Sequence, residues 1–131
     1  VPVLISAKEC CSLFPAGISV EDNRYLGDKI LDYDIRGNHK FKHYNFYEIN
    51  PRLATSLEHL TEDIALSIGI KNMGRIDYRI DSTGNAYVTD IATNPHITKS
   101  MTFYYEYQEL GLTYTDVLDT LIGLALSWES L

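Results

Sequence analysis

The sequence predicts an α+β fold in which helices pack on a largely antiparallel sheet. Apolar residues recur at helical spacing over residues 53–68 and 117–126, whereas residues 74–80 and 86–92 alternate in the manner of strands. Five residues of turn-forming composition separate the two alternating segments, so these segments are expected to pair as a hairpin. A hairpin set between helices is typical of α+β proteins.

The first fifty residues are expected to be rich in loops. Residues 1–6 have the composition of a short buried strand. Residues 8–27 are predicted to form a long loop, because Pro15, Gly17 and the polar cluster at residues 21–23 interrupt any periodicity. Residues 25–47 are expected to hold one or two irregular strands.

Residues 51–131 are expected to form a helix, the hairpin and two further helices. Asn50 and Pro51 have the types that begin a helix, and Gly69 stands where that helix would end. A second helix is predicted over about residues 100–110. The last helix should begin at residues 113–116 (TYTD), which form a capping box ahead of an apolar face.

The hairpin concentrates charged residues on one of its faces. A turn centred between positions 83 and 84 opposes three pairs of residues: Ile80 with Tyr87, Asp77 with Asp90, and Arg75 with Ala92. Alternation assigns the other face to an apolar set that is expected to be buried: Ile76, Tyr78, Ile80, Tyr87, Thr89 and Ile91.

Two directly opposed aspartates repel one another, so Asp77 and Asp90 need a positive partner. Arg75 could act as a structural counter-ion, and the spacing alone favours this interpretation. A divalent cation is the functional alternative, because Mg²⁺ prefers one or two carboxylates together with phosphate oxygens.

Composition limits the classes of partner. The chain has 131 residues, 45% hydrophobic and 22% charged, which suits a globular domain with its own core. A net charge of −7 argues against a nucleic-acid partner, which requires a basic surface. No apolar run is long enough to cross a bilayer. Cys10 and Cys11 are adjacent, where disulfide geometry is poor, so a reduced, cytoplasmic setting without a membrane partner is expected.

Several short motifs, in this order and at these spacings, resemble the D-alanine–D-alanine ligase family of the ATP-grasp superfamily. They read GRID at residues 74–77, DSxGxxY at 81–87 and DxxTxP at 90–95, followed by GLTY at 111–114 and LIGLAL at 121–126. The resemblance covers residues 53–126 well and residues 1–50 loosely. It implies that residues 1–131 form one ATP-grasp-like carboxyl-terminal domain.

The resemblance also implies a chemistry. In this family ATP converts a carboxylate to an acyl phosphate, and an amine then attacks the acyl carbon. Arg75 would be the catalytic residue that stabilises negative charge on the reacting groups. Asp77 and Asp90 would bind Mg²⁺ or Mn²⁺ that bridges the nucleotide phosphates, although the family usually has glutamate at the second position. The implied partners are the nucleotide and a small amino-acid or dipeptide-like substrate.

Three departures from the family pattern concern the ligands. Ala92 replaces a metal-binding asparagine, so Asn94 is expected to supply that ligand instead. His96 replaces a glycine, and Met101 replaces a serine that would bind a substrate carboxylate, with Ser100 one residue earlier. His96 and Ser100 are therefore the expected substrate-binding residues. D-Alanine is the leading candidate substrate within a broader class of amino-acid or peptide-like carboxylates.

The family's glycine-rich lid, phosphate-binding lysine and adenine-hinge acidic residue find no counterpart in this sequence. The amino-terminal and nucleotide-lid subdomains are thus expected to be missing partners. The chain alone is therefore expected to be inactive. The sequence neither predicts nor excludes a homodimer. Two alternatives remain: a non-catalytic binding or scaffold protein descended from the ATP-grasp fold, and a ligase for another amino acid.

Two further groups of polar residues precede the first predicted helix. His39 and His43 have a metal-like spacing, but an exposed polar segment is the favoured interpretation. Asp32, Asp34 and Arg36 are candidates for a substrate-facing loop.

Overall fold

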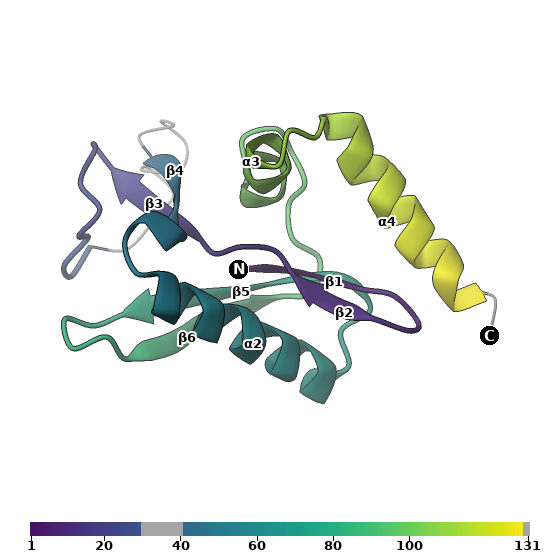
Figure 1. Cartoon of the computed structure of the whole chain (residues 1–131), viewed down its shortest axis with the longest axis horizontal. Helices are drawn as coiled ribbons and strands as arrows, with labels where there is room; N and C mark the ends of the chain where they lie inside the picture. Colours follow the sequence, from purple (N-terminus) through teal and green to yellow (C-terminus); the bar gives the residue numbers. More distant parts are fainter. Residues whose placement is uncertain (30–40, 130–131) are drawn as a thin grey trace.

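The computed structural model describes residues 1–29 and 41–129 and confirms the α+β class (Figure 1). A four-stranded antiparallel sheet has the strand order β2-β1-β5-β6, with the bounds β1 Pro2–Ile5, β2 Cys10–Ser12, β5 Asn72–Ile80 and β6 Ala86–Ala92. A second, two-stranded sheet pairs β3 Ala16–Val20 with β4 Phe41–Asn45. The helices are a 3₁₀ turn η1 Phe46–Glu48, α2 Pro51–Ile68, α3 Thr102–Glu109 and α4 Tyr114–Glu129.

Local side-chain bonds fix the ends of the helices where the sequence predicts them. The Asn50 side chain accepts a hydrogen bond from the Leu53 N–H at 3.1 Å and so begins α2. Gly69 ends this helix with a φ of +76°, a left-handed conformation that favours glycine. At α4, the Asp116 carboxylate accepts from both the backbone and the hydroxyl of Thr113 at 2.6 Å.

The hydrophobic core lies where α2 crosses β1 and β5 (Figure 1). Its buried residues come from these elements and from the loop after α2: Val3, Ile5, Ala65, Ile70 and Ile76. Trp128 near the end of α4 packs against the same cluster. Because Ile76 is fully buried in this core, the charged residues on either side of it in β5 stand on a rigid strand.

The prediction of a long loop over residues 8–27 is wrong, because this segment contains β2 and β3. β2 pairs with β1, and β3 pairs with β4, which is remote in sequence. Gly17 does not serve a turn. It lies directly opposite Tyr44, and a Cβ atom at this position would overlap the Tyr44 ring. Glycine is therefore required here for close approach of an aromatic ring.

The predicted register of the hairpin is right near the charged residues and wrong near the turn. Asp77 faces Asp90 and Arg75 faces Ala92, but Ile80 faces Ala86 instead of Tyr87. A β-bulge accounts for the difference, since the register shifts between Asp77 and Tyr78.

The prediction of a buried apolar face holds only for part of β5. Ile76 is buried, and Tyr78 is half-buried with its hydroxyl 2.9 Å from that of Thr61 on α2. Ile80 and three residues of β6 are exposed: Tyr87, Thr89 and Ile91. β6 is an edge strand of the sheet, and these side chains lack the cover that the alternation predicts.

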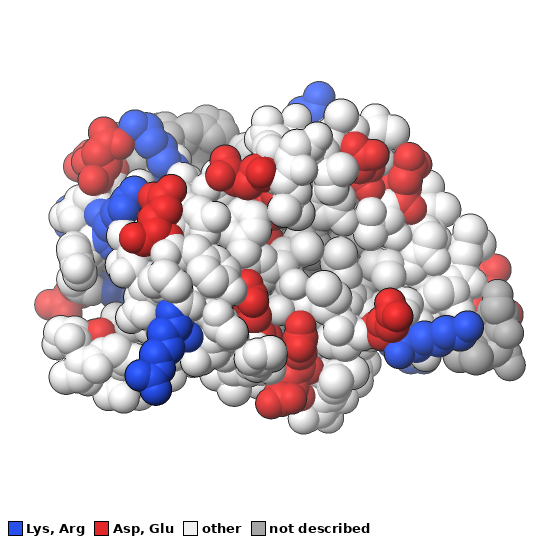
Figure 2. Space-filling model, in the orientation of Figure 1, with Lys and Arg blue, Asp and Glu red and all other residues white. Residues whose placement is uncertain are grey.

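Charged side chains pair at the end of the molecule that carries β3 and β4. Lys42 contacts Asp22 at 2.6 Å, and Arg24 contacts Glu48 at 3.2 Å while lying over the Tyr44 ring. Figure 2 shows basic groups beside acidic ones in this region. In the part of the chain that the structure describes, no helix is both long and apolar enough to cross a membrane.

Candidate active site

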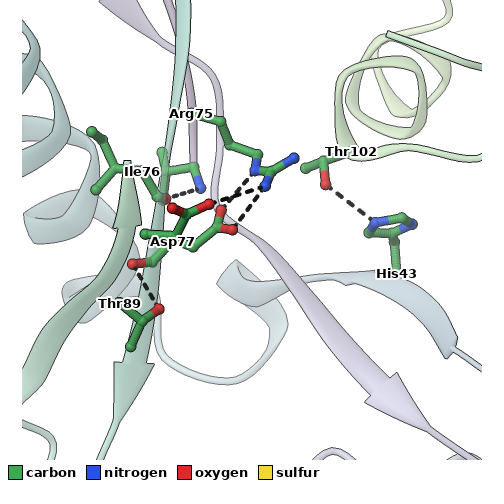
Figure 3. A network of polar contacts seen from close by, with 8 residues as sticks. His43, Arg75, Ile76, Asp77, Thr89 and Thr102 are labelled. Atoms are coloured by element: carbon green, nitrogen blue, oxygen red, sulfur yellow. Dashed lines mark hydrogen bonds and ion pairs between the residues drawn. The ribbon is translucent and has the colours of Figure 1, made fainter. Parts of the chain in front are cut away.

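Arg75 and Asp77 lie together on β5 (Figure 3), and Asp90 lies directly opposite Asp77 on β6. Arg75 donates from Nε to Asp77 Oδ1 at 2.7 Å and from Nη2 to Asp77 Oδ2 at 2.9 Å, a two-pronged contact. Its Nη2 lies 4.0 Å from Asp90 Oδ2. The guanidinium therefore neutralises Asp77 directly and Asp90 only in part.

The exposure of these side chains rises from Arg75 through Asp77 to Asp90. The exposed fraction is 16% for Arg75, 32% for Asp77 and 63% for Asp90. Burial around Arg75 and Asp77 strengthens their interaction, whereas Asp90 faces solvent. Of the two aspartates, Asp90 is thus the more accessible to an incoming cation.

The two aspartates would suit a magnesium ion only if its other ligands came from outside the described residues. Within residues 1–29 and 41–129, no group of three or more His, Cys, Asp or Glu side chains could hold a metal by itself. Mg²⁺ typically binds one or two protein carboxylates together with phosphate oxygens and water. The donor set of Asp77 and Asp90 suits this mode of binding.

The backbone around Asp77 is held from both sides. The Thr89 hydroxyl, at the bulge in β6, donates to the Asp77 carbonyl at 3.1 Å. The Val1 nitrogen donates to the Ile76 carbonyl at 2.8 Å. Bulges often re-aim a side chain beside a functional site. Here the bulge ends the predicted register directly after the Asp77–Asp90 pair.

The three other residues predicted for the site lie in the segment after β6. Asn94, His96 and Ser100 are all exposed. The Ser100 hydroxyl lies 3.4 Å from that of Thr98, while Asn94 and His96 form no hydrogen bond with the described part of the chain. Their roles as metal ligand and substrate-binding residues remain predictions.

His43 is a residue of this region that the sequence interpretation missed. Instead of belonging to an exposed polar segment, it is half-buried on β4, and its Nε2 lies 3.2 Å from the Thr102 hydroxyl at the start of α3. Burial, and then the positive charge of Arg75, lower the pKa of His43 below its usual 6.5. Alternation over residues 41–45 was the available signal, because it places Phe41 and His43 on one face.

The segment predicted to face the substrate adjoins a contact with β5. Arg79 donates to the Lys29 carbonyl at 2.7 Å and also to the Gly27 carbonyl. Asp32, Asp34, Arg36 and His39 lie outside the described residues. The contacts of Arg79 tie the chain just before this segment to the strand that carries Arg75 and Asp77.

Comparison with known proteins identifies the family of most of the chain. Residues 10–123 match the family described as D-ala D-ala ligase C-terminus. A D-alanine–D-alanine ligase of Levilactobacillus brevis is 39% identical over 61 residues, 47% of this chain and 16% of that protein. One of Limosilactobacillus reuteri is 31% identical over 84 residues, 61% of this chain and 22% of that protein.

The bifunctional enzyme MurC/Ddl of Chlamydia caviae is 32% identical over 68 residues, 52% of this chain and 8% of that enzyme. The chain spans less than a quarter of the length of each of these relatives. The family match, in contrast, extends over most of the chain. The chain therefore belongs to the D-ala D-ala ligase C-terminal family.

Proposed function

We propose that this chain is the carboxyl-terminal catalytic portion of an ATP-dependent carboxylate–amine ligase that acts through an acyl phosphate. The observation that carries the proposal is the placement of two opposed carboxylates and a guanidinium on one rigid hairpin. Phosphoryl transfer depends mainly on positioning and on neutralisation of developing charge, and these groups supply both.

Each residue has a distinct role in this proposal. Asp77 and Asp90 would hold Mg²⁺ or Mn²⁺, which would supply positive charge to offset the negative charge of the ATP phosphates. Arg75 directs its guanidinium at the negative charge that develops on the phosphoryl and acyl groups. Asp77 keeps this guanidinium oriented through its two hydrogen bonds. In this proposal the two aspartates bind the cation, and Asp77 also orients the Arg75 guanidinium.

D-Alanine is the leading candidate substrate, because the matched relatives are named D-alanine–D-alanine ligases. That assignment would place the chain in the cytoplasmic synthesis of peptidoglycan for the cell wall. His96 and Met101, which depart from the family pattern, favour the alternative of a ligase for another amino acid. Ala92 favours a non-catalytic protein descended from the fold, because alanine offers the metal no oxygen.

Coupling between metal and nucleotide tests the function. We expect a non-hydrolysable ATP analogue to tighten Mn²⁺ binding to the 131-residue chain, since phosphate oxygens complete the coordination that two carboxylates leave open. Isothermal titration with and without the analogue measures this effect. We expect no ATP hydrolysis by the chain alone, because Asp90 is 63% exposed and such an open site does not hold bound phosphates in the geometry that transfer requires.

Two results would contradict the proposal. An affinity for Mn²⁺ that is the same with and without the analogue would favour a non-catalytic protein. The same conclusion would follow if Asp77→Asn coupled metal and nucleotide as well as the wild type does. Asp119→Asn is the matched control, because it removes an equal charge from an exposed position on α4.

Restoring the family's asparagine should strengthen the metal site. Ala92 lies two residues beyond Asp90 on the same face of β6 and directly opposite Arg75. Ala92→Asn adds a neutral oxygen there, and we expect about a tenfold gain in Mn²⁺ affinity, comparable to a hydrogen bond with a charged group. Asn94→Ala should weaken binding if Asn94 replaces the missing ligand.

Titration of both variants with Mn²⁺ measures these effects. Ala92→Val is the control for added volume without an oxygen, and it should leave the affinity unchanged. An affinity of Ala92→Asn equal to that of the wild type would place the metal elsewhere.

A further inference from the structure

A row of three polar side chains leads away from the aspartates toward α3 (Figure 3). Arg75 projects from β5, Thr102 begins α3, and His43 stands on β4. Thr102 lies between the other two in Figure 3, and its hydroxyl is 3.2 Å from His43 Nε2. Three elements remote in sequence therefore bring polar groups together beside the guanidinium.

Arg75 retains hydrogen-bonding capacity on this side. Its Nε and Nη2 are occupied by Asp77, while Nη1 has no hydrogen-bond partner within the described residues. Figure 3 shows the guanidinium directed toward the side of Thr102. The Arg75 side chain is only 16% exposed, so its unused N–H has limited access to water and is available to a bound acceptor.

Aromatic packing fixes the His43 ring. Tyr105 stacks on it with ring centroids 5.2 Å apart and 19° between the planes, and Phe41 meets it edge-on at 5.5 Å. Phe14 packs edge-on against Tyr105 in turn. A ring held in this way presents one nitrogen to Thr102 in a constant orientation.

The tautomer of His43 decides where the Thr102 proton points. Among residues 1–29 and 41–129, Arg75 and the Tyr105 phenol are the ionisable groups that face His43, and the lowered pKa leaves the ring neutral at pH 7. A neutral ring protonated on Nε2 donates to the Thr102 oxygen and leaves the hydroxyl proton free to point toward Arg75. A ring protonated on Nδ1 instead accepts that proton and directs it away from Arg75.

We propose that Thr102 is a substrate-binding residue that, together with the open Nη1 edge of Arg75, binds the carboxylate of the amino-acid substrate, and that His43 is its positioning residue. Two carboxylate oxygens match one N–H and one O–H donor, and a single negative charge suits a guanidinium already shared with Asp77. The phosphate oxygens of the nucleotide are expected on the other side of Arg75, next to Asp77 and Asp90, where the metal would bind. The inference rests on the proposed function and assigns a specific part of its substrate.

The ring nitrogens of His43 give a direct readout. In ¹⁵N NMR of the 131-residue chain, we expect D-alanine or acetate to shift His43 toward the form protonated on Nε2. Inorganic phosphate should have little effect. A purely structural histidine would show no change in tautomer with either anion.

Paired variants separate binding from packing. His43→Phe keeps a ring against Tyr105 but loses the hydrogen bond, so it should fold normally and bind acetate about two- to tenfold more weakly. Thr102→Val should remove the ¹⁵N response of His43, whereas Thr102→Ser, which keeps the hydroxyl, should retain it.

Three results would overturn the inference: no change of the His43 nitrogens with a carboxylate, a larger change with phosphate, or full acetate affinity in His43→Phe. The variant Asp90→Asn distinguishes a failure of this inference from a failure of the proposed function. This variant should lose the metal response yet keep the carboxylate response at His43. A wild-type chain that couples Mn²⁺ to nucleotide but shows no His43 response would refute only the carboxylate site.

Discussion

Replacing Glu106 with methionine is expected to stabilise the protein at neutral pH. Glu106 is fully buried on α3, and neither carboxyl oxygen has a hydrogen-bond partner among the described residues. A buried polar group without a partner costs about 1–3 kcal/mol, which methionine avoids at similar size. Thermal unfolding should show a rise in Tm of about 5–10 °C.

Glu106 is also expected to make the free energy of unfolding depend on pH. Burial raises the pKa of Glu106 well above its ordinary 4.5; the Val1 amino group opposes this effect and Glu58 adds to it. The folded state therefore keeps a proton that the unfolded chain releases above pH 4.5. Stability contributed by this site should fall as the pH rises from there to the raised pKa, and the fall should stop above it.

Two variants test whether the charge or the missing partner matters. Glu106→Gln should remove the pH dependence but give a smaller gain in stability, since the amide is still unpaired. Glu109→Gln, on the exposed side of the same helix, should change neither property. If Glu106→Met were less stable than the wild type at pH 7, the attraction between Glu106 and the Val1 amino group would outweigh the cost of burying the carboxyl group.

Saturating Mn²⁺ is expected to raise the Tm of the wild-type chain, and Asp90→Asn should remove this response. Binding at a hundredfold excess over Kd stabilises the folded state by about 2.7 kcal/mol, or about 5–10 °C here. Without metal, Asp90→Asn should be the more stable protein by about 0.2–1 kcal/mol, because it relieves repulsion across the Asp77–Asp90 pair. Differential scanning calorimetry measures both changes.

Features with local signals could be predicted from the sequence. Asn50, Gly69 and the Thr113–Asp116 pair each act within one turn of a helix end, so their residue types identified α2 and α4. The opposition of Asp77 and Asp90 followed from alternation and a short turn. Asp81 fixes that turn by accepting from the backbone N–H groups of Thr83 and Asn85.

Features that depend on distant partners could not be predicted. β3 exists because it pairs with β4, more than twenty residues later, and Gly17 is needed because Tyr44 lies opposite it. The bulge beside Asp77 changes the register without a glycine or proline to mark it. His43 became part of the site only through Thr102 and Tyr105 on α3, about sixty residues away in sequence.

Titration of Mn²⁺ into the wild-type chain, Asp90→Asn and the control Asp119→Asn tests the central claim most directly. The two variants lose the same charge, but only Asp90 faces Asp77 across the hairpin. If Asp77 and Asp90 form the metal site, the wild type and Asp119→Asn should bind Mn²⁺ equally, and Asp90→Asn should bind it at least tenfold more weakly. Equal affinity in all three proteins would contradict the assignment and leave Arg75 as the structural counter-ion of the pair.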